Sequence, residues 1–244
     1  MLRASAAGSY RFVPGDGRLP FCHAVIADDG YEIVRAQFER PVPWREGFAA
    51  AERHLAQAGR PRQALCAVEL RCPRPYTPEG FGAFNDEYAA VLAEWGVYVD
   101  QIGSATRTNV APELVAPAEQ AMWAFAYTAP TSAAGTTWVL SGATEDEELR
   151  TGDVGAGAIR ARVASVATQL SEHLAELGQP FSAATHVSLY TVHDAQAALW
   201  AELLPRLGGA ALQGVRWYPS RPPIVGLELE IDARRVLREI VLTP

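Results

Sequence analysis

Residues 54–71, HLAQAGRPRQALCAVELR, and residues 173–191, HLAELGQPFSAATHVSLYT, have the same pattern. Each begins with His-Leu-Ala at the end of a helical segment, reaches a glycine (Gly59 or Gly178), and continues after a proline into a strand-like stretch. The matching histidines and glycines are related by one common offset. Several elements that recur in one order at one offset indicate an internal duplication.

Helical periodicity surrounds both stretches. Apolar residues recur at three- and four-residue steps and predict four helices, which lie within residues 48–59, 77–96, 159–178 and 200–208. In the second of these, Thr77 is the predicted N-cap and Pro78 takes the first helical position. Glycines close all four segments, as helix C-termini favour.

Strand-like alternation fills the positions between the helices, over residues 66–70, 187–191 and 225–231. Residues 122–128 and 237–243 are predicted to be the closing strands of the two halves. The stretch 236–242 is apolar on both faces, which predicts a strand covered on both sides.

A Pro/Ser/Gly-rich segment, residues 130–136, separates two units. We expect an N-terminal unit over residues 1–130 and a C-terminal unit over residues 137–244. Each is predicted to be α+β, a mixed sheet with two helices packed on one face. The uncovered sheet face is expected to be buried against other copies of the unit.

Composition excludes several classes of function. The net charge of −7 disfavours nucleic acid as a partner, because phosphate binding needs a basic surface. All basic residues are arginines, so Schiff-base and P-loop lysine chemistry is excluded. No apolar run approaches the length that crosses a bilayer, and the N-terminus lacks a signal peptide. We therefore expect a cytoplasmic protein without a membrane partner.

The cysteines and histidines do not have the spacing of a metal site. Cys22, Cys66 and Cys72 contain no C-x-x-C pair, and their odd number argues against a disulfide framework. The five histidines show neither H-x-x-x-H nor H-E-x-x-H spacing. No metal is expected.

An ordered set of motifs in the second half resembles the RidA (YjgF) family. It comprises WVLSG at 138–142, GDVGAGAIRARVASVATQLSEHLAELG at 152–178, ATHVSLYTVHDAQAALWAELLPRL at 184–207 and SRPPIVGLELEIDARRVLREIVL at 220–242. The resemblance covers about residues 137–242, with a diverged copy over about 31–128. It implies two tandem RidA-like (chorismate-mutase-like) units and a homo-oligomer in multiples of three. Within the family, the tandem arrangement is most similar to deaminases of 2-aminomuconate type.

The resemblance assigns the chemistry to Arg221 and Glu239. Arg221 matches the family arginine that grips a substrate carboxylate, for which a bidentate guanidinium is suited. Its structural alternative is an ion pair with a neighbouring glutamate such as Glu228 or Glu230. Glu239 matches a glutamate that positions water, and burial should raise its pKa. The alternative for Glu239 is an ion pair with an arginine.

Further substrate-binding positions follow from the same resemblance. Arg107 is predicted to occupy the place of Arg221 in the first half, with Trp123 in the place of Glu239. Arg107 would then hold a distal carboxylate, or be structural. The backbone of Ser141 and Gly142 can present N–H groups to the substrate, or form an ordinary turn.

Two residues at the end of the strand-like stretch 187–191 and just beyond it complete the predicted set. Tyr190 and His193 are expected close to the substrate, although His193 also suits a turn or cap.

These residues predict a hydrolytic deaminase of a small enamine or imine carboxylic acid, acting without cofactor or metal. A generic 2-imino acid deaminase and a non-catalytic carboxylate-binding trimer remain alternatives. The substitution Glu239→Gln would distinguish them: an enzyme should lose turnover and keep ligand affinity, whereas a binding protein has no turnover to lose.

Overall fold

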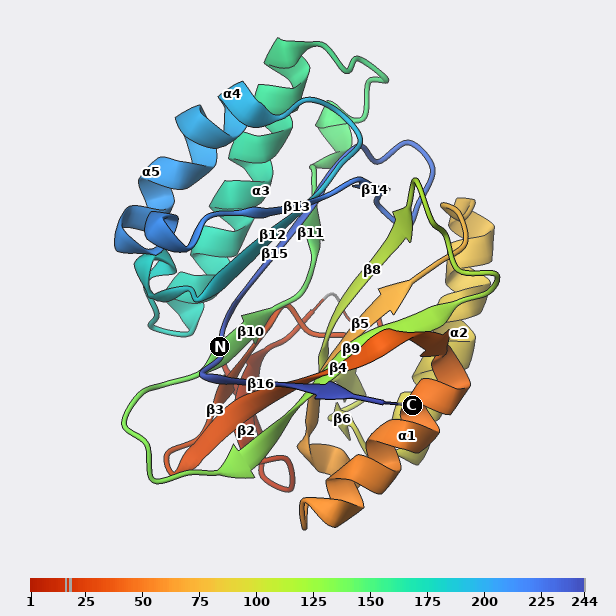
Figure 1. Ribbon diagram of the computed structural model, residues 1–244, viewed down its shortest axis with the longest axis vertical. Coiled ribbons are helices and arrows are strands. Elements are labelled where there is room, and N and C mark those ends of the chain that lie inside the picture. Colours follow the sequence, from red (N-terminus) through yellow and green to blue (C-terminus); the bar gives the residue numbers. More distant parts are fainter. Residues whose placement is uncertain (16, 18, 244) are drawn as a thin grey trace.

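The computed structural model describes residues 1–15, 17 and 19–243. Two β-sheets face each other, and helices cover the outer face of each (Figure 1). The protein is thus a four-layer α/β/β/α arrangement, in agreement with the predicted α+β class. In the described part of the chain, no helix is both long and apolar enough to cross a membrane.

The first sheet lies beneath two helices, α1 (Trp44–Gln57) and α2 (Pro78–Glu94). Its strands are β4 (Tyr31–Pro43), β5 (Leu65–Arg71), β8 (Thr106–Pro112), β9 (Ala121–Pro130), β14 (Ser220–Arg221) and β16 (Arg238–Leu242). Their order is β14-β8-β5-β9-β4-β16. Apolar side chains on the outer face pack against the helices, among them Val68, Leu70 and Phe125.

The second sheet carries α3 (Ala156–Glu176), α4 (Gln196–Ala198) and α5 (Leu204–Leu207). Its strands are β1 (Arg3–Ser5), β2 (Tyr10–Val13), β3 (Ala24–Ala27), β10 (Trp138–Leu140), β11 (Ala143–Thr144), β12 (His186–Tyr190), β13 (Arg216–Tyr218) and β15 (Glu230–Arg235). The order is β1-β2-β3-β10-β15-β12-β13, with β11 paired to β15. A small separate hairpin joins β6 (Tyr98–Val99) to β7 (Ile102–Gly103).

Four strands of each sheet share one topology. In the first sheet, β9 lies antiparallel between β4 and β5, and β5 runs parallel to β8. In the second, β15 lies antiparallel between β10 and β12, and β12 runs parallel to β13. The strand of the second sheet that corresponds to β9 in position is therefore β15, not β16. The predicted match of Trp123, on β9, with Glu239, on β16, is wrong.

The predicted helices are all present, and their termini follow from the sequence. The Thr77 side chain accepts a hydrogen bond from Gly80 N at 3.1 Å, which confirms the predicted N-cap. Gly59 and Gly178 take positive φ beyond α1 and α3, where a residue without a Cβ is favoured. The fourth helix is irregular, because a π-helical stretch, Leu199–Leu203, separates α4 from α5.

The two sheets exchange strands across the predicted boundary at residues 130–137. β3 pairs with β10, so the N-terminal strands β1 to β3 extend the second sheet. At the other end of the chain, β16 crosses to the first sheet and runs parallel to β4 (Figure 1). Each half of the sequence therefore supplies strands to the sheet of the other half.

Two predictions about the C-terminal strands need correction. The strand expected over residues 225–231 begins only at Glu230, because the chain turns at Gly226, which has φ of +90°. The stretch 236–242 is not covered on both sides: β16 is an edge strand, and the Val241 side chain is 68% exposed. Its apolar residues meet the first sheet on one side only.

The inner faces of the sheets meet in a layer that is partly apolar and partly charged. Tyr10, Phe12, Val25 and Ile33 belong to the apolar part. Polar residues at alternate positions of the strands form the remainder, namely Arg35, Glu69, Thr108, Tyr190, Asp232 and Arg234.

Candidate functional site

The two sheets meet at the outer edge of β8. The backbone N–H of Arg107 donates to the Ser141 hydroxyl at 2.9 Å, and Gly142 N donates to Arg107 O at 3.1 Å. The Ser141 hydroxyl in turn donates to Cys22 O at 2.6 Å. Three predicted site residues, Arg107, Ser141 and Gly142, are thus brought together by backbone contacts.

Glu230 completes this junction from the first position of β15. Its side chain is buried, and it accepts a hydrogen bond from the backbone N–H of Asn109. A Cβ added at Gly142 would lie 1.8 Å from Glu230 Oε1, so the carboxyl group packs directly against the glycine backbone. Gly142 is required here for the close approach of a side chain.

Burial raises the pKa of Glu230 well above its ordinary value, and repulsion from Asp232 adds to the effect. Arg107 and Arg71 act in the opposite direction but do not cancel it. The raised pKa favours the protonated form of Glu230, which is able to donate a proton. A carboxylic acid of this kind is typical of a site that performs acid–base chemistry.

Arg107 is buried beneath α2 and is only 4% exposed. The centres of the Phe21, Phe81, Phe84 and Tyr88 rings lie 4.4 to 5.8 Å from its guanidinium carbon. Its Nη1 donates to Asn85 Oδ1 at 2.8 Å.

Among the residues that the structure describes, no carboxylate forms an ion pair with Arg107. Burial lowers the pKa of Arg107 to about 10, so the group still carries its charge at neutral pH. A buried cation without an anion is costly, and the aromatic rings offset only part of that cost. The arrangement suits a site that receives an anion.

Arg71, at the end of β5, is a second buried guanidinium near Glu230. Its carbon lies 5.5 Å from the Tyr190 ring centre and 5.8 Å from that of Trp123. Its Nη1 donates to Leu70 O at 2.8 Å, and in the described part of the chain no carboxylate pairs with it. Arg71 also lines a cavity of about 620 Å³ that opens to the surface.

A buried network links the site to the layer between the sheets. Asp232 Oδ2 accepts hydrogen bonds from the Tyr190 and Thr108 hydroxyls, each at 2.9 Å. This network places Tyr190 with Asp232, two residues beyond Glu230 on the same face of β15. Tyr190 is therefore next to the site, in a position that fixes Asp232.

The start of β15 is held by a second buried carboxylate. Glu145 accepts hydrogen bonds from the backbone N–H groups of Glu228 at 2.7 Å and Leu229 at 3.3 Å. Arg162, which is fully buried in α3, lies 3.3 Å from Glu145 Oε1. Because these contacts immediately precede Glu230, they fix the direction in which β15 enters the site.

Side-chain amides form a hydrogen-bonded chain beside the site. The Tyr76 hydroxyl donates to Gln120 Oε1 at 2.7 Å, and Gln120 Nε2 donates to Asn109 Oδ1 at 3.0 Å. The Asn109 Nδ2 group is buried and has no hydrogen-bond partner among the described residues. Such an unsatisfied donor is available to a ligand.

Arg221 lies at the rim, outside this cluster. It is on β14, which pairs with the end of β8, so it does not occupy the position that Arg107 has within β8. The predicted equivalence of Arg107 and Arg221 is therefore wrong. Arg221 makes a bidentate ion pair with Glu113, with distances of 2.8 and 3.2 Å, and is partly exposed.

His193 is at the same rim. Its Nε2 lies 2.7 Å from Glu228 Oε2, and its backbone N–H donates to the Thr191 hydroxyl at 3.2 Å. These contacts are those of a turn residue whose ring is hydrogen-bonded to Glu228, and a turn or cap residue is the alternative considered for it.

Glu239 lies on β16, at the opposite edge of the first sheet from Arg221. Five strand spacings separate those edges, or about 24 Å at 4.8 Å per step, so one chain does not bring the two residues together. Burial opposes ionisation of Glu239, but Arg234 at 3.0 Å and Arg35 outweigh it and lower its pKa. The predicted rise in pKa is wrong, because arginines surround the group.

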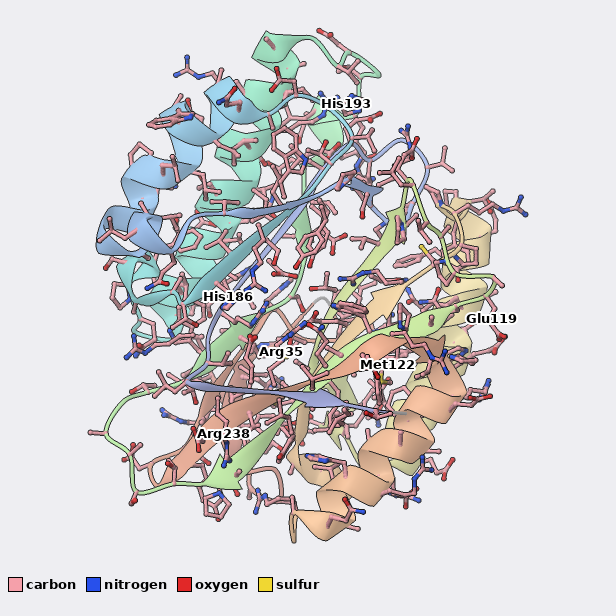
Figure 2. All side chains as sticks on the ribbon, viewed as in Figure 1. Arg35, Glu119, Met122, His186, His193 and Arg238 are labelled. Atoms are coloured by element: carbon pink, nitrogen blue, oxygen red, sulfur yellow. The ribbon has the colours of Figure 1, made fainter. Side chains whose placement is uncertain are left out.

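Arg35 belongs to the same charge network as Glu239. Figure 2 shows Arg35 and His186 in the space between the sheets. Arg35 makes a bidentate ion pair with Glu69 at 2.6 and 2.7 Å. Burial opposes the charge on Glu69, but this arginine lowers the pKa of Glu69 to about 2. This part of the layer is an internally neutralised ion-pair network, in contrast to Arg107 and Arg71.

The sequence prediction missed Glu230 and Arg71. Both lie in alternating strands, VELR and LELEID, and the alternation correctly assigned them to the polar face. That face was expected to be buried against other copies of the unit, and in the described chain it is buried against the other sheet. Among the described residues, no group of three or more His, Cys, Asp or Glu side chains is placed to hold a metal ion.

Comparisons with known proteins place the chain next to deaminases. A family model described as 2-aminomuconate deaminase CnbZ matches residues 2–240. The 2-amino-5-chloromuconate deaminase of Comamonas testosteroni is 36% identical over 246 residues, covering 96% of each chain.

Solved structures show more distant likenesses. A YjgF/YER057c/UK114 family member from Mycobacterium tuberculosis is 17% identical, with a TM-score of 0.27 over 41% of this chain and 79% of that one. A chorismatase is 12% identical, with a TM-score of 0.49 over 96% of this chain and 79% of that one.

Proposed function

The chain belongs to the 2-aminomuconate deaminase family, and we propose that it hydrolyses a 2-aminomuconate-like enamine or imine acid and releases ammonia. The proposed site is the junction of Arg107, Ser141, Gly142 and Glu230, with Arg71 beside it. No cofactor is invoked, because a protonated imine is already electrophilic.

One observation carries the proposal. Glu230 is a buried carboxyl group with a raised pKa, and near it lie two arginines that make no ion pair with a carboxylate among the described residues. A structural ion pair would join Glu230 directly to one of them and lower its pKa, as happens at Glu69. The separation leaves the arginines to bind substrate anions and favours the protonated form of Glu230.

The reaction can be written with these groups alone. Arg107 holds the carboxylate beside the amino-bearing carbon, and Glu230 donates its proton to the neighbouring enamine carbon, which gives an iminium ion. Water then adds to the iminium carbon, and its proton returns to the Glu230 carboxylate. Transfer of a proton to nitrogen allows the C–N bond to break, so that enamine and water yield a 2-oxo acid and ammonia.

We further infer that the site lies between two copies of a duplicated RidA-like unit. Support comes from the shared order and direction of four strands in each sheet. Arg107 comes from the first unit, and Ser141, Gly142 and Glu230 come from the second.

The test measures ammonia release from freshly generated 2-aminomuconate by wild type, Glu230→Gln and Glu239→Gln. The first variant keeps the shape of a neutral carboxyl group but cannot donate an acidic proton, so kcat should fall by about 10²–10⁴-fold. Glu239→Gln should retain most of the activity. A simple 2-imino acid, assayed in parallel, distinguishes generic imine clearance.

The reverse result, with activity lost in Glu239→Gln and kept in Glu230→Gln, would identify Glu239 on β16 as the catalytic carboxyl group instead of Glu230. Absence of turnover on both substrates in wild type would contradict the deaminase proposal and favour the carboxylate-binding alternative. Circular dichroism of each variant checks that the fold is retained.

A further inference from the structure

The cavity of about 620 Å³ beside the junction is lined almost entirely by apolar side chains. Trp123 and Tyr218 contribute to its walls, and Leu114 and Val115 extend from the loop between β8 and β9. These two loop residues are more than 80% exposed. Glu119, on the same loop, lies at the outer edge of the molecule (Figure 2).

Arg71 is the cation of this cavity. It is 6% exposed and contributes to the cavity lining, so the cavity gives access to this otherwise buried side chain. Among the described residues its side chain makes one hydrogen bond, from Nη1 to Leu70 O, which leaves Nε and Nη2 available to the oxygens of an anion. The neighbouring Trp123 and Tyr190 rings hold the guanidinium in place.

An apolar cavity with one buried cation matches a defined chemical class. A ligand that fills it carries one carboxylate on an unsaturated or hydrocarbon body, and substituents such as chlorine add apolar surface that the walls can cover. Water in the same cavity could accept hydrogen bonds from Arg71, but the apolar walls would then remain hydrated, which is less favourable than covering them with a hydrocarbon body.

We propose that this cavity binds the distal half of a dicarboxylate substrate, with the distal carboxylate on Arg71 and the carbon chain between Trp123 and Tyr218. The proposal rests on the proposed function, because it places the amino-bearing end of the same molecule at Glu230. It makes Arg71 the residue that selects diacids over monoacids. The open loop carrying Leu114 and Val115 tolerates substituents on the chain.

The test compares binding of two unreactive ligands by calorimetry. Muconate has two carboxylates on a six-carbon diene, and sorbate has the same chain with one. Wild type should bind muconate at least about tenfold more tightly than sorbate, as a charge-assisted hydrogen bond predicts. This comparison needs no variant, so it remains decisive if a substitution at Arg71 prevents folding.

Arg71→Met keeps the length and packing of the side chain and removes its charge, and it should abolish the preference for muconate. Arg71→Lys should restore part of the preference. Arg74→Met, at an exposed position three residues away, is the matched control and should behave as wild type.

Equal binding of muconate and sorbate by wild type, or an unchanged preference in Arg71→Met, overturns the proposal. Turnover that depends on Glu230 would still stand in that case. Conversely, a preference that depends on Arg71 without any turnover supports the cavity as a dicarboxylate site and contradicts the deaminase.

Discussion

Strands β8 and β13 each run parallel to the neighbouring inner strand of their sheet, but they have different surroundings. β8 is seven residues long, and its first six residues are buried. β13 is three residues long, with Arg216 and Trp217 exposed. The outer edge of β8 is covered by Ser141 and Glu230 from the second half of the chain, whereas β13 is the open edge of its sheet.

The difference shows what a site in this fold requires. Arg107 on β8 is buried where the other sheet supplies a carboxyl group and a glycine turn against the strand. The chain does this once, at β8. Arg216 on β13 has no such cover within the chain.

The largest expected effect comes from closing the space between Gly142 and Glu230. In Gly142→Ala the new methyl group would lie 1.8 Å from Glu230 Oε1, so the carboxyl group must move. We expect an activity loss of about 10²-fold or more and destabilisation of about 1–3 kcal/mol, measured by steady-state kinetics and denaturant unfolding.

Gly157→Ala in α3 is the matched control, because an added Cβ there meets nothing within 4 Å. It should leave activity unchanged and leave stability equal or up to about 1 kcal/mol higher. Equal behaviour of the two variants would mean that the contact of Gly142 with Glu230 has no part in function.

The pH dependence should report Glu230 directly. Since the protonated form is required, kcat should be constant below the raised pKa and fall about tenfold per pH unit above it. The free energy of unfolding should change in the same direction. The contribution of Glu230 to it is complete below the carboxyl pKa of the unfolded chain, about 4.3, and is lost as pH rises through the pKa in the folded protein.

Glu230→Gln cannot ionise, so its unfolding free energy should lack this decline. Chemical denaturation curves of wild type and variant, compared from about pH 4 upward, measure the difference. An identical pH dependence in both proteins would contradict a raised pKa for Glu230.

Arg221 should have a smaller effect, because its ion pair with Glu113 is partly exposed and worth about 0–1 kcal/mol. Glu113 begins the loop that walls the cavity, so Arg221→Ala should raise KM a few-fold and leave kcat unchanged. A loss of kcat as large as that expected for Glu230→Gln would instead support the carboxylate-gripping role that the sequence resemblance assigned to Arg221.

The open edge of β13 should affect assembly rather than chemistry. A homo-oligomer in multiples of three is still a prediction, and sedimentation velocity tests it; a monomer or simple dimer would contradict it. Trp217→Glu should weaken assembly if β13 meets a second chain. Trp200→Glu, at a more exposed position on the helical side, is the control.

The sequence predicted the elements better than their surroundings. Thr77, Gly59 and Gly178 define helix ends by local hydrogen bonds and backbone freedom, which neighbouring residues determine, and all three predictions are confirmed. The alternation of Glu69 with Leu70 identified the strand faces. It could not tell whether the polar face meets water or a second sheet, because period two is the same in both cases.

The site residues divide in the same way. Ser141, Gly142 and Arg107 were predicted and do lie together, since they belong to recognisable turns and strands. Glu230 was interpreted as a surface partner of Arg221, because strand pairing between distant segments decides its burial. Local sequence patterns also could not predict that β16 pairs with β4 of the first sheet.

The position of β16 also affects how the protein is made. During synthesis, β4 and its neighbours emerge early, but the strand that pairs with the free edge of β4 is translated near the far end of the sequence. Until then the nascent first sheet presents an unpaired edge to other nascent chains. Folding of this long-range pairing should therefore be slow, and the protein should be most prone to aggregate before β16 leaves the ribosome.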